Sequence, residues 1–319
     1  MDLLAEVLAV GGVQGTLGVR LEGAEPWALQ WTHIPGAAFY AVTAGTSWLA
    51  IHGREPLRLS PGDVVLLPTG VSHTLSSDPG ARAPECDPDA ASHAQLTGDV
   101  LRFGTGEVQS RMLAATYSHD PAVSTQILQL LPEVVHLPAD SSGSCLDDSV
   151  RLLTRELAYP QLGTSVVLNR LVDILLIQFL RVWLARRPEE AKETWLGVLD
   201  DPLLTAALTK LHDDPAHPWT TELLAAELGV SRATLTRRFA STTGQAPGAY
   251  LTRWRMDLAA RRLRDSDDTL DTIARSVGYT TPYAFSRAFT RSRGQSPGRY
   301  RVTARAEQQT DAYAVPARA

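Results

Sequence analysis

The chain has 319 residues, of which 44% are hydrophobic and 20% are charged, and this is enough for two domains with a sizeable core in each. Its acidic start lacks the basic region of a signal peptide, and charged residues interrupt its most apolar segment, 166–184, which argues against secretion and a membrane span. Cys86 and Cys145 are the only cysteines, which excludes a disulfide scaffold. We therefore expect a cytoplasmic protein with no membrane partner.

The net charge of −5 conceals a strong asymmetry along the chain. Residues 219–305 contain fifteen arginines, no lysine and seven acidic residues, a net charge of +8, while the rest of the chain carries −13. A local basic excess of this size favours contact with nucleic acid. The lack of lysine adds little, because Lys192 and Lys210 are the only lysines in the whole chain. The charge split itself therefore predicts a nucleic-acid partner.

The N-terminal half has the sequence pattern of a β protein. Residues 2–8 carry leucine and valine at helical spacing and predict a short amphipathic helix. From residue 15 to about 75, glycine and proline separate short apolar or alternating runs, which is typical of a β-sandwich or β-barrel. Residues 96–117 return to this pattern, and 127–137 is expected to pack on the barrel as the chain leaves it.

One motif in this region is more specific than the rest. Gly62, Pro68, Gly70 and His73 form the pattern G-x5-P-x-G-x2-H, which resembles the second conserved motif of the cupin double-stranded β-helix barrel. The resemblance implies that turns enclose a short strand and that His73 begins the next strand, pointing into the barrel. In metal-binding cupins this histidine is a ligand, and an upstream H-x-H…E motif supplies the others. The chain lacks that upstream motif.

The barrel interior is the expected place for a small-molecule effector. One convincing histidine cannot complete the three or four ligands that a metal site needs, so we expect neither a metal nor another cofactor. His73 is instead interpreted as a structural or effector-contacting residue. The candidates for effector contact are His73, His33 and Tyr40.

Residues 78–98 are rich in proline, aspartate, alanine and serine and predict a long loop. The loop contains Cys86, which leaves open a redox role for this residue together with Cys145.

Two helices are predicted after the strands, at 146–158 and 165–187. The second has apolar residues over most of its circumference, so it is expected to bury against more than one neighbour. This surface is interpreted either as core within the chain or as a homodimer interface, with equal support for each. The interface candidates are Leu168, Leu171, Leu175 and Phe179.

The last third of the chain contains one pattern twice. The first copy runs from L-A-A-E-L-G-V-S at 224–231 to G-Q-A-P-G-A-Y at 244–250. The second runs from I-A-R-S-V-G-Y-T at 273–280 to G-Q-S-P-G-R-Y at 294–300, with one extra residue between its glycine and its phenylalanine. A repeat of this length indicates a duplicated supersecondary unit.

Each copy has the features of a helix-turn-helix. Ala225 and Ala274 are small where two helices must approach closely, and the glycine four residues later fits the tight turn. Ser231 and Thr280 are expected to cap the second helix of each pair. Residues 252–264 are strong helix formers and predict a helix that joins the two units.

This double motif, with G-Y-x4-A-F-S-R-A-F at 278–289, resembles the AraC family of transcriptional regulators from residue 219 to residue 301. The acidic barrel and its helices also resemble the effector-binding and dimerisation half of that family. The resemblance implies that the exposed faces of the two recognition helices contact base edges in the major groove of DNA. These residues are Arg232, Ala233, Thr236, Arg237, Pro282, Tyr283, Ser286 and Arg287. Arg238, Arg291 and Arg299 lie off these faces and are candidates for phosphate contact or solvation.

The sequence therefore predicts an α+β protein: a cupin-like ligand-sensing and dimerisation domain at 1–187, a linker at 188–202, a double helix-turn-helix domain at 203–305 and a disordered tail at 306–319. We expect a sequence-specific, DNA-binding transcriptional regulator without enzymatic activity, a homodimer on double-stranded promoter DNA that a small-molecule effector controls. The alternatives are a cupin-type metal-dependent enzyme, or a cysteine redox sensor, fused to the DNA-binding module.

Overall fold

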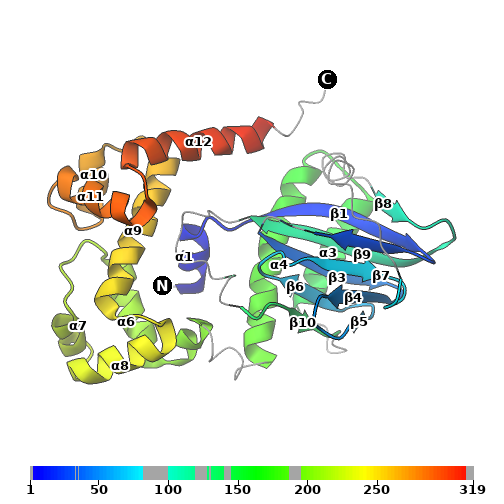
Figure 1. Cartoon of the computed structure of the whole chain (residues 1–319), viewed down its shortest axis with the longest axis horizontal. Coiled ribbons are helices and arrows are strands. Elements are labelled where there is room, and N and C mark those ends of the chain that lie inside the picture. Colours follow the sequence, from blue (N-terminus) through cyan, green and yellow to red (C-terminus); the bar gives the residue numbers. More distant parts are fainter. Residues whose placement is uncertain are drawn as a thin grey trace. The chain divides into compact units, whose positions relative to one another are not determined.

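The computed structural model describes residues 3–32, 34, 36–81, 100–118, 128, 131–139, 145–186 and 195–313. By their contacts the residues of the chain form two units (Figure 1). The barrel unit comprises residues 14–118 and 131–187, and the helical unit comprises residues 1–13, 119–130 and 188–319. The N-terminal segment thus belongs with the helical unit, whereas the sequence assigned it to the domain that contains the barrel.

The strands of the barrel unit form two sheets. The six-stranded sheet has the order β10-β6-β3-β9-β1-β8, with bounds Val135–Leu137, Val64–Leu67, Ala37–Ala44, Val108–Ser118, Gln14–Ala24 and Val100–Phe103. The four-stranded sheet has the order β2-β7-β4-β5, with bounds Ala28–Trp31, His73–Ser76, Ser47–Ile51 and Leu57–Leu59. Neighbours are antiparallel except for β1 and β8, which are parallel.

The motif from Gly62 to His73 folds as the sequence predicts. Gly62 and Gly70 have positive φ values of 91° and 60° in the turns before and after β6, and His73 is the first residue of β7. A Cβ atom at Gly70 would lie 2.0 Å from the carbonyl oxygen of Ile34, so only glycine fits this turn.

Both sheets contribute to one apolar core, because alternate side chains of each strand point inward. Its buried members include Val19, Leu21, Trp27, Tyr40, Val42, Leu49, Ile51, Val65, Leu67, Leu75, Met112 and Ala114.

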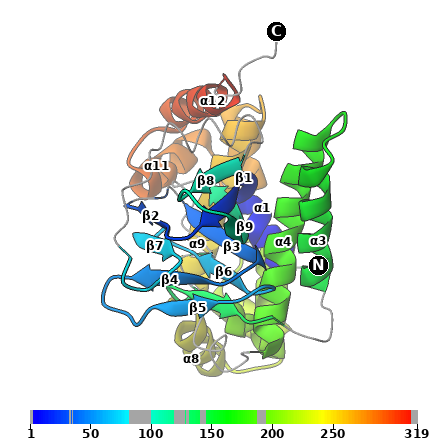
Figure 2. The ribbon, with the colours of Figure 1, turned by 90° about the vertical axis from the view of Figure 1, so that its right-hand side faces the viewer.

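Two helices, α3 (Cys145–Ala158) and α4 (Thr164–Arg186), pack side by side, and α4 lies against β1 and β10 of the six-stranded sheet (Figure 2). Phe179 packs edge-to-face on Phe39, with 5.7 Å between the ring centroids, and the Tyr117 hydroxyl donates to the carbonyl of Val172 at 2.8 Å. The predicted dimer residues Leu168, Leu171, Leu175 and Phe179 are 7%, 7%, 1% and 0% exposed. The interface prediction is wrong for these four residues, because α4 buries this face within its own chain.

The helical unit contains the two predicted helix-turn-helix units. The first consists of α7 (Thr221–Glu227) and α8 (Arg232–Thr243), and the second of α10 (Leu270–Ser276) and α11 (Pro282–Arg293). The helix α9 (Pro247–Asp265) joins them, as predicted, and α12 (Pro297–Tyr313) follows. Phe239 and Phe289 are completely buried and hold each recognition helix on its core.

Caps determine where the recognition helices begin. Ser231 caps α8 as predicted, since its hydroxyl accepts a backbone N–H at 3.1 Å. The cap of α11 is Thr281, at 3.2 Å from its backbone donor, and not the predicted Thr280. The extra residue of the second copy lengthens its turn and moves the cap by one position. Pro282 then occupies the first turn, where its missing N–H costs nothing.

Two predicted boundaries are also corrected. A 3-10 helix, η2 (Trp195–Asp200), and α6 (Pro202–Asp213) begin within the stretch that was expected to be a linker. The helix α12 continues to Tyr313, so residues 306–313 are helical rather than a disordered tail. Among the described helices, none is long and apolar enough to cross a membrane.

The short N-terminal helix α1 (Leu3–Val10) buries five apolar residues and contacts α6 and α9 of the helical unit. His212 of α6 donates from Nδ1 to the carboxylate of Glu6 at 2.9 Å, and its Nε2 is hydrogen-bonded to the Tyr250 hydroxyl at 2.8 Å. The His212 ring also stacks on Trp254, with centroids 3.8 Å apart. One buried histidine therefore joins α1, α6 and α9.

Candidate nucleic-acid interface and barrel interior

The predicted base-reading residues lie on the accessible faces of α8 and α11. Arg232, Ala233 and Arg237 are exposed and Thr236 is half-buried on α8. Tyr283 and Arg287 are exposed on α11, where Pro282 and Ser286 are half-buried. The buried phenylalanines point the opposite way, so each helix presents one polar, basic face to solvent.

These two helices are also free of acidic residues along their whole length. Some arginines elsewhere in the helical unit are paired with carboxylates, for example Arg275 with Asp271 at 2.9 Å. Arg237, Arg287 and Arg291 of these helices have no carboxylate partner in the described part of the chain, so their positive charge is available to attract a polyanion.

The arginine side chains on the two exposed faces differ in their interaction partners. Arg232 forms an exposed ion pair with Glu222 at 2.8 Å, and Arg287 lies over the Tyr283 ring, 5.8 Å from its centroid. Arg237 has no ion-pair or hydrogen-bond partner for its side chain within the described part of the chain. An exposed ion pair is worth little, so Arg232 can exchange Glu222 for a phosphate or a base.

Arg238 has a structural partner that the sequence did not reveal. Its guanidinium donates to Asp201 at 2.6 Å, and Asp201 also caps α6 by accepting from two backbone N–H groups. This contact fastens α8 to the helix that precedes the first helix-turn-helix. Arg238 was a candidate for phosphate contact or solvation, and this ion pair gives it an additional role in positioning α8.

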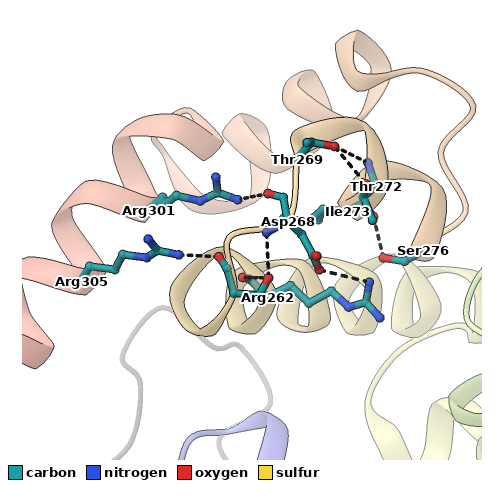
Figure 3. A network of polar contacts seen from close by, with 9 residues as sticks. Arg262, Asp268, Thr269, Thr272, Ile273, Ser276, Arg301 and Arg305 are labelled. Atoms are coloured by element: carbon teal, nitrogen blue, oxygen red, sulfur yellow. Dashed lines mark hydrogen bonds and ion pairs between the residues drawn. The ribbon is translucent and has the colours of Figure 1, made fainter.

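The second helix-turn-helix is positioned by arginines of α12 (Figure 3). Arg301 donates to the carbonyl of Asp268 at 2.5 Å, and Arg305 donates to the carbonyl of Ser266. Both carbonyls belong to the connection before α10, whose first turn is capped by Thr269. The helix α12 therefore fixes the start of α10.

A buried ion pair connects α11 to the joining helix α9. Asp257 of α9 is 0% exposed, and its carboxylate accepts from the guanidinium of Arg293 at the end of α11. Breaking such a pair leaves a buried charge without compensation. The orientation of α11 on α9 therefore depends on this contact, which motif spacing alone does not reveal.

Inside the barrel, His73 and Tyr40 form a polar pair. The Tyr40 hydroxyl lies 2.7 Å from His73 Nε2, and His73 Nδ1 lies 2.6 Å from the carbonyl of Val71. Because a carbonyl only accepts, Nδ1 carries the proton and Nε2 accepts from Tyr40. Burial lowers the pKa of His73 to about 4, against a smaller opposing effect of the Val71 carbonyl. At neutral pH the ring is therefore uncharged, and both of its nitrogens are hydrogen-bonded.

Trp31, which the sequence did not single out, stacks on His73 with 5.4 Å between centroids. The predicted effector residues His73 and Tyr40 thus come together. His33 lies outside the described residues, as does Cys86. Within the described ranges, no three His, Cys, Asp or Glu residues are grouped so that they could hold a metal ion.

Comparison with known protein families matches a separate family to each half of the chain. The family described as Cupin matches residues 2–185, and the family described as Helix-turn-helix domain matches residues 224–303.

Whole-length relatives were found as well. An AraC-like transcription regulator of Streptomyces lividans is 37% identical over 303 residues, covering 94% of this chain and 98% of that protein. The HTH-type transcriptional regulator MtrA of Neisseria gonorrhoeae is 30% identical, with 94% and 98% covered. Among solved structures, the DNA-binding domain of AdpA in complex with a target DNA is 37% identical over 34% of this chain and 97% of that chain, with a TM-score of 0.32.

Proposed function

This chain belongs to the AraC family of transcriptional regulators, and we propose that it reads DNA through two unequal recognition helices under the control of a small molecule in its barrel. It is a sequence-specific DNA-binding regulator, and the relatives that it matches regulate transcription and are not enzymes. The observation that carries the proposal is the pair of acid-free helices, α8 and α11, whose exposed faces carry the basic and polar residues.

We propose that Arg237 and Arg287 make the principal base contacts. Each lies on the exposed face opposite a buried phenylalanine, and arginine can donate two hydrogen bonds to the O6 and N7 atoms of guanine. Arg232, Thr236, Tyr283 and Ser286 flank them, while Ala233 and Pro282 offer only apolar contact. Arg287 approaches the DNA beside an aromatic ring and Arg237 does not, so the two helices are expected to prefer different bases.

The joining helix supports simultaneous binding in two grooves. The 19 residues of α9 span about 28 Å at 1.5 Å per residue. Successive major grooves on one face of DNA are roughly 34 Å apart. A single helix of this length can therefore hold the two recognition helices in neighbouring grooves.

The experiment begins with DNA that the full chain selects from a random pool. Affinity for the selected sequence is then measured for Arg237→Ala, Arg287→Ala and the control Arg261→Ala on α9. Loss of a bidentate base contact should weaken specific binding about 10- to 100-fold, whereas the control should stay within a few-fold of the parent. If both test variants kept the affinity of the parent, the assignment of Arg237 and Arg287 as base-contacting residues would be wrong.

We also propose that the regulator is a homodimer. The predicted face of α4 is buried, but Leu152 of α3 and Val167 and Ile174 of α4 are 48%, 42% and 44% exposed. Exposed apolar side chains on two packed helices favour a protein partner, and a second copy of the chain would provide a matching surface. The proposed interface therefore consists of exposed residues of α3 and α4, in place of the four buried residues of α4 that the sequence suggested.

The barrel is the proposed effector-binding site, because its interior is apolar and enclosed by two sheets. Binding there is tested by measuring whether a candidate molecule changes both the melting temperature of the protein and its affinity for the selected DNA.

A further inference from the structure

Three buried polar groups of the barrel lack hydrogen-bond partners. The indole N–H of Trp27 and the hydroxyls of Ser47 and Ser110 have no partner within the described part of the chain. The residues are 4%, 0% and 2% exposed, so bulk water does not replace the missing bonds. Buried donors in proteins are almost always satisfied, and each exception calls for a physical explanation, such as strain, a functional role or a bound water or ion.

Register places the three groups at the same end of the barrel. Ser110 of β9 pairs with Gly23 of β1, and a Cβ atom at Gly23 would lie 2.3 Å from Trp27 Nε1 and 2.6 Å from Ser110 Oγ. The turn before Ser47 packs on the same strand, since a Cβ at Gly45 would lie 2.8 Å from the Cα of Ser110. The His73–Tyr40 pair lies further along the barrel, because His73 pairs with Ile51 at the other end of β4.

The surroundings of the three donors are apolar. The next inward-facing residues along the same strands are Leu21, Leu49 and Met112, all members of the barrel core. The charged residues nearby in sequence face the other way, where Glu22 pairs with Arg102 at 2.9 Å. A carboxylate bound among the three donors would be buried without a cation, which is costly.

We propose that Trp27, Ser47 and Ser110 form the polar anchor of the effector site, and that its ligand is a small apolar molecule with a neutral carbonyl oxygen. This inference rests on the proposed effector control. It also moves the polar contact away from His73, whose two nitrogens already have partners. The carbonyl oxygen accepts from the three donors, and the apolar body contacts the core residues beside them.

The test compares two probes of similar size, acetophenone and ethylbenzene, which differ in the carbonyl group. Binding to the full chain is titrated by calorimetry and ligand-detected NMR. The parent should bind acetophenone about tenfold more tightly than ethylbenzene, and Ser47→Ala/Ser110→Ala should lose that preference. Without a probe, the double variant should melt at the parent temperature or higher, because it removes groups that have no partner.

Ser76→Ala is the matched control. Ser76 is equally buried at the same end of the barrel, but its hydroxyl donates to the carbonyl of Asp78 at 2.7 Å. This variant should melt at a lower temperature and keep the preference for acetophenone.

Three results would overturn the proposal: no binding of either probe, a preference that survives in the double variant, or a preference lost in Tyr40→Phe instead. A lower melting temperature of the probe-free double variant would also contradict it, since the hydroxyls would then have partners. DNA binding is measured separately on the same variants. A parent that binds acetophenone but no selected DNA would contradict the proposed function while leaving the anchor intact.

Discussion

The buried histidine of the barrel makes stability depend on pH. The pKa of His73 is lowered to about 4 in the folded chain, whereas the unfolded value is 6.5. Above pH 6.5 the ring is neutral in both states. As the pH falls below 6.5, the unfolded state takes up a proton first, so stability decreases until the folded ring also protonates near pH 4. At 1.36 kcal/mol per pH unit, the total loss is about 3 kcal/mol.

Replacement of His73 by glutamine removes this titration. At about pH 7 the variant should be less stable by roughly 1–3 kcal/mol, because it disrupts the hydrogen bond to Tyr40. By about pH 4.5 that deficit should largely disappear, since the parent has lost most of its own advantage. The free energy of unfolding is measured by urea titration with tryptophan fluorescence, which Trp31 reports at close range.

His52→Gln is the matched control, because His52 is an exposed histidine of the same unit. Its free energy of unfolding at pH 7 should match the parent's, so the difference between the two variants isolates the effect of burial. If the deficit of His73→Gln were the same at pH 7 and pH 4.5, His73 would not be buried as a neutral ring, and the assigned hydrogen bonds would be wrong.

The remaining predictions concern the helices. Asp257→Ala leaves Arg293 buried without its counter-ion and should destabilise the helical unit by about 3–5 kcal/mol in urea titration; a loss below 1 kcal/mol would contradict the buried pair. Thr281→Ala should cost about 0.5–2 kcal/mol and Thr280→Ala almost nothing, and the reverse order would restore Thr280 as the cap of α11. Ile174→Glu should shift the protein from dimer to monomer in analytical ultracentrifugation, and an unchanged dimer would exclude this face.

Local patterns were enough to predict the turns around β6, the two helix-turn-helix units and the joining helix. In each case the signal is carried by residues whose chemistry acts over a few positions, such as glycine in a turn or a serine cap. The cap of α11 was misplaced by one residue because Thr280 and Thr281 are chemically equivalent. Only the length of the preceding turn distinguishes them.

Other features depend on which elements pack against one another in the folded chain. The spacing of apolar residues shows that a face is buried, but it does not identify the packing partner. The apolar circumference of α4 indicates burial, but not whether the partner is the sheet or a second chain. The helix α1 is amphipathic in the sequence, yet its partner depends on His212, 206 residues away from Glu6. Ser47 and Ser110 are ordinary strand residues in the sequence, and their burial without partners becomes visible only when the two sheets are assembled.

The central claim is that the two recognition helices bind neighbouring grooves and read different bases. Hydroxyl-radical footprinting of the full chain on its selected DNA tests this most directly. Each half-site should show two protected patches about 10 base pairs apart on one face of the DNA. Arg237→Ala should reduce the protection from cleavage in one patch, and Arg287→Ala should reduce it in the other. A single patch per half-site, or equal loss of both patches in each variant, would contradict the account.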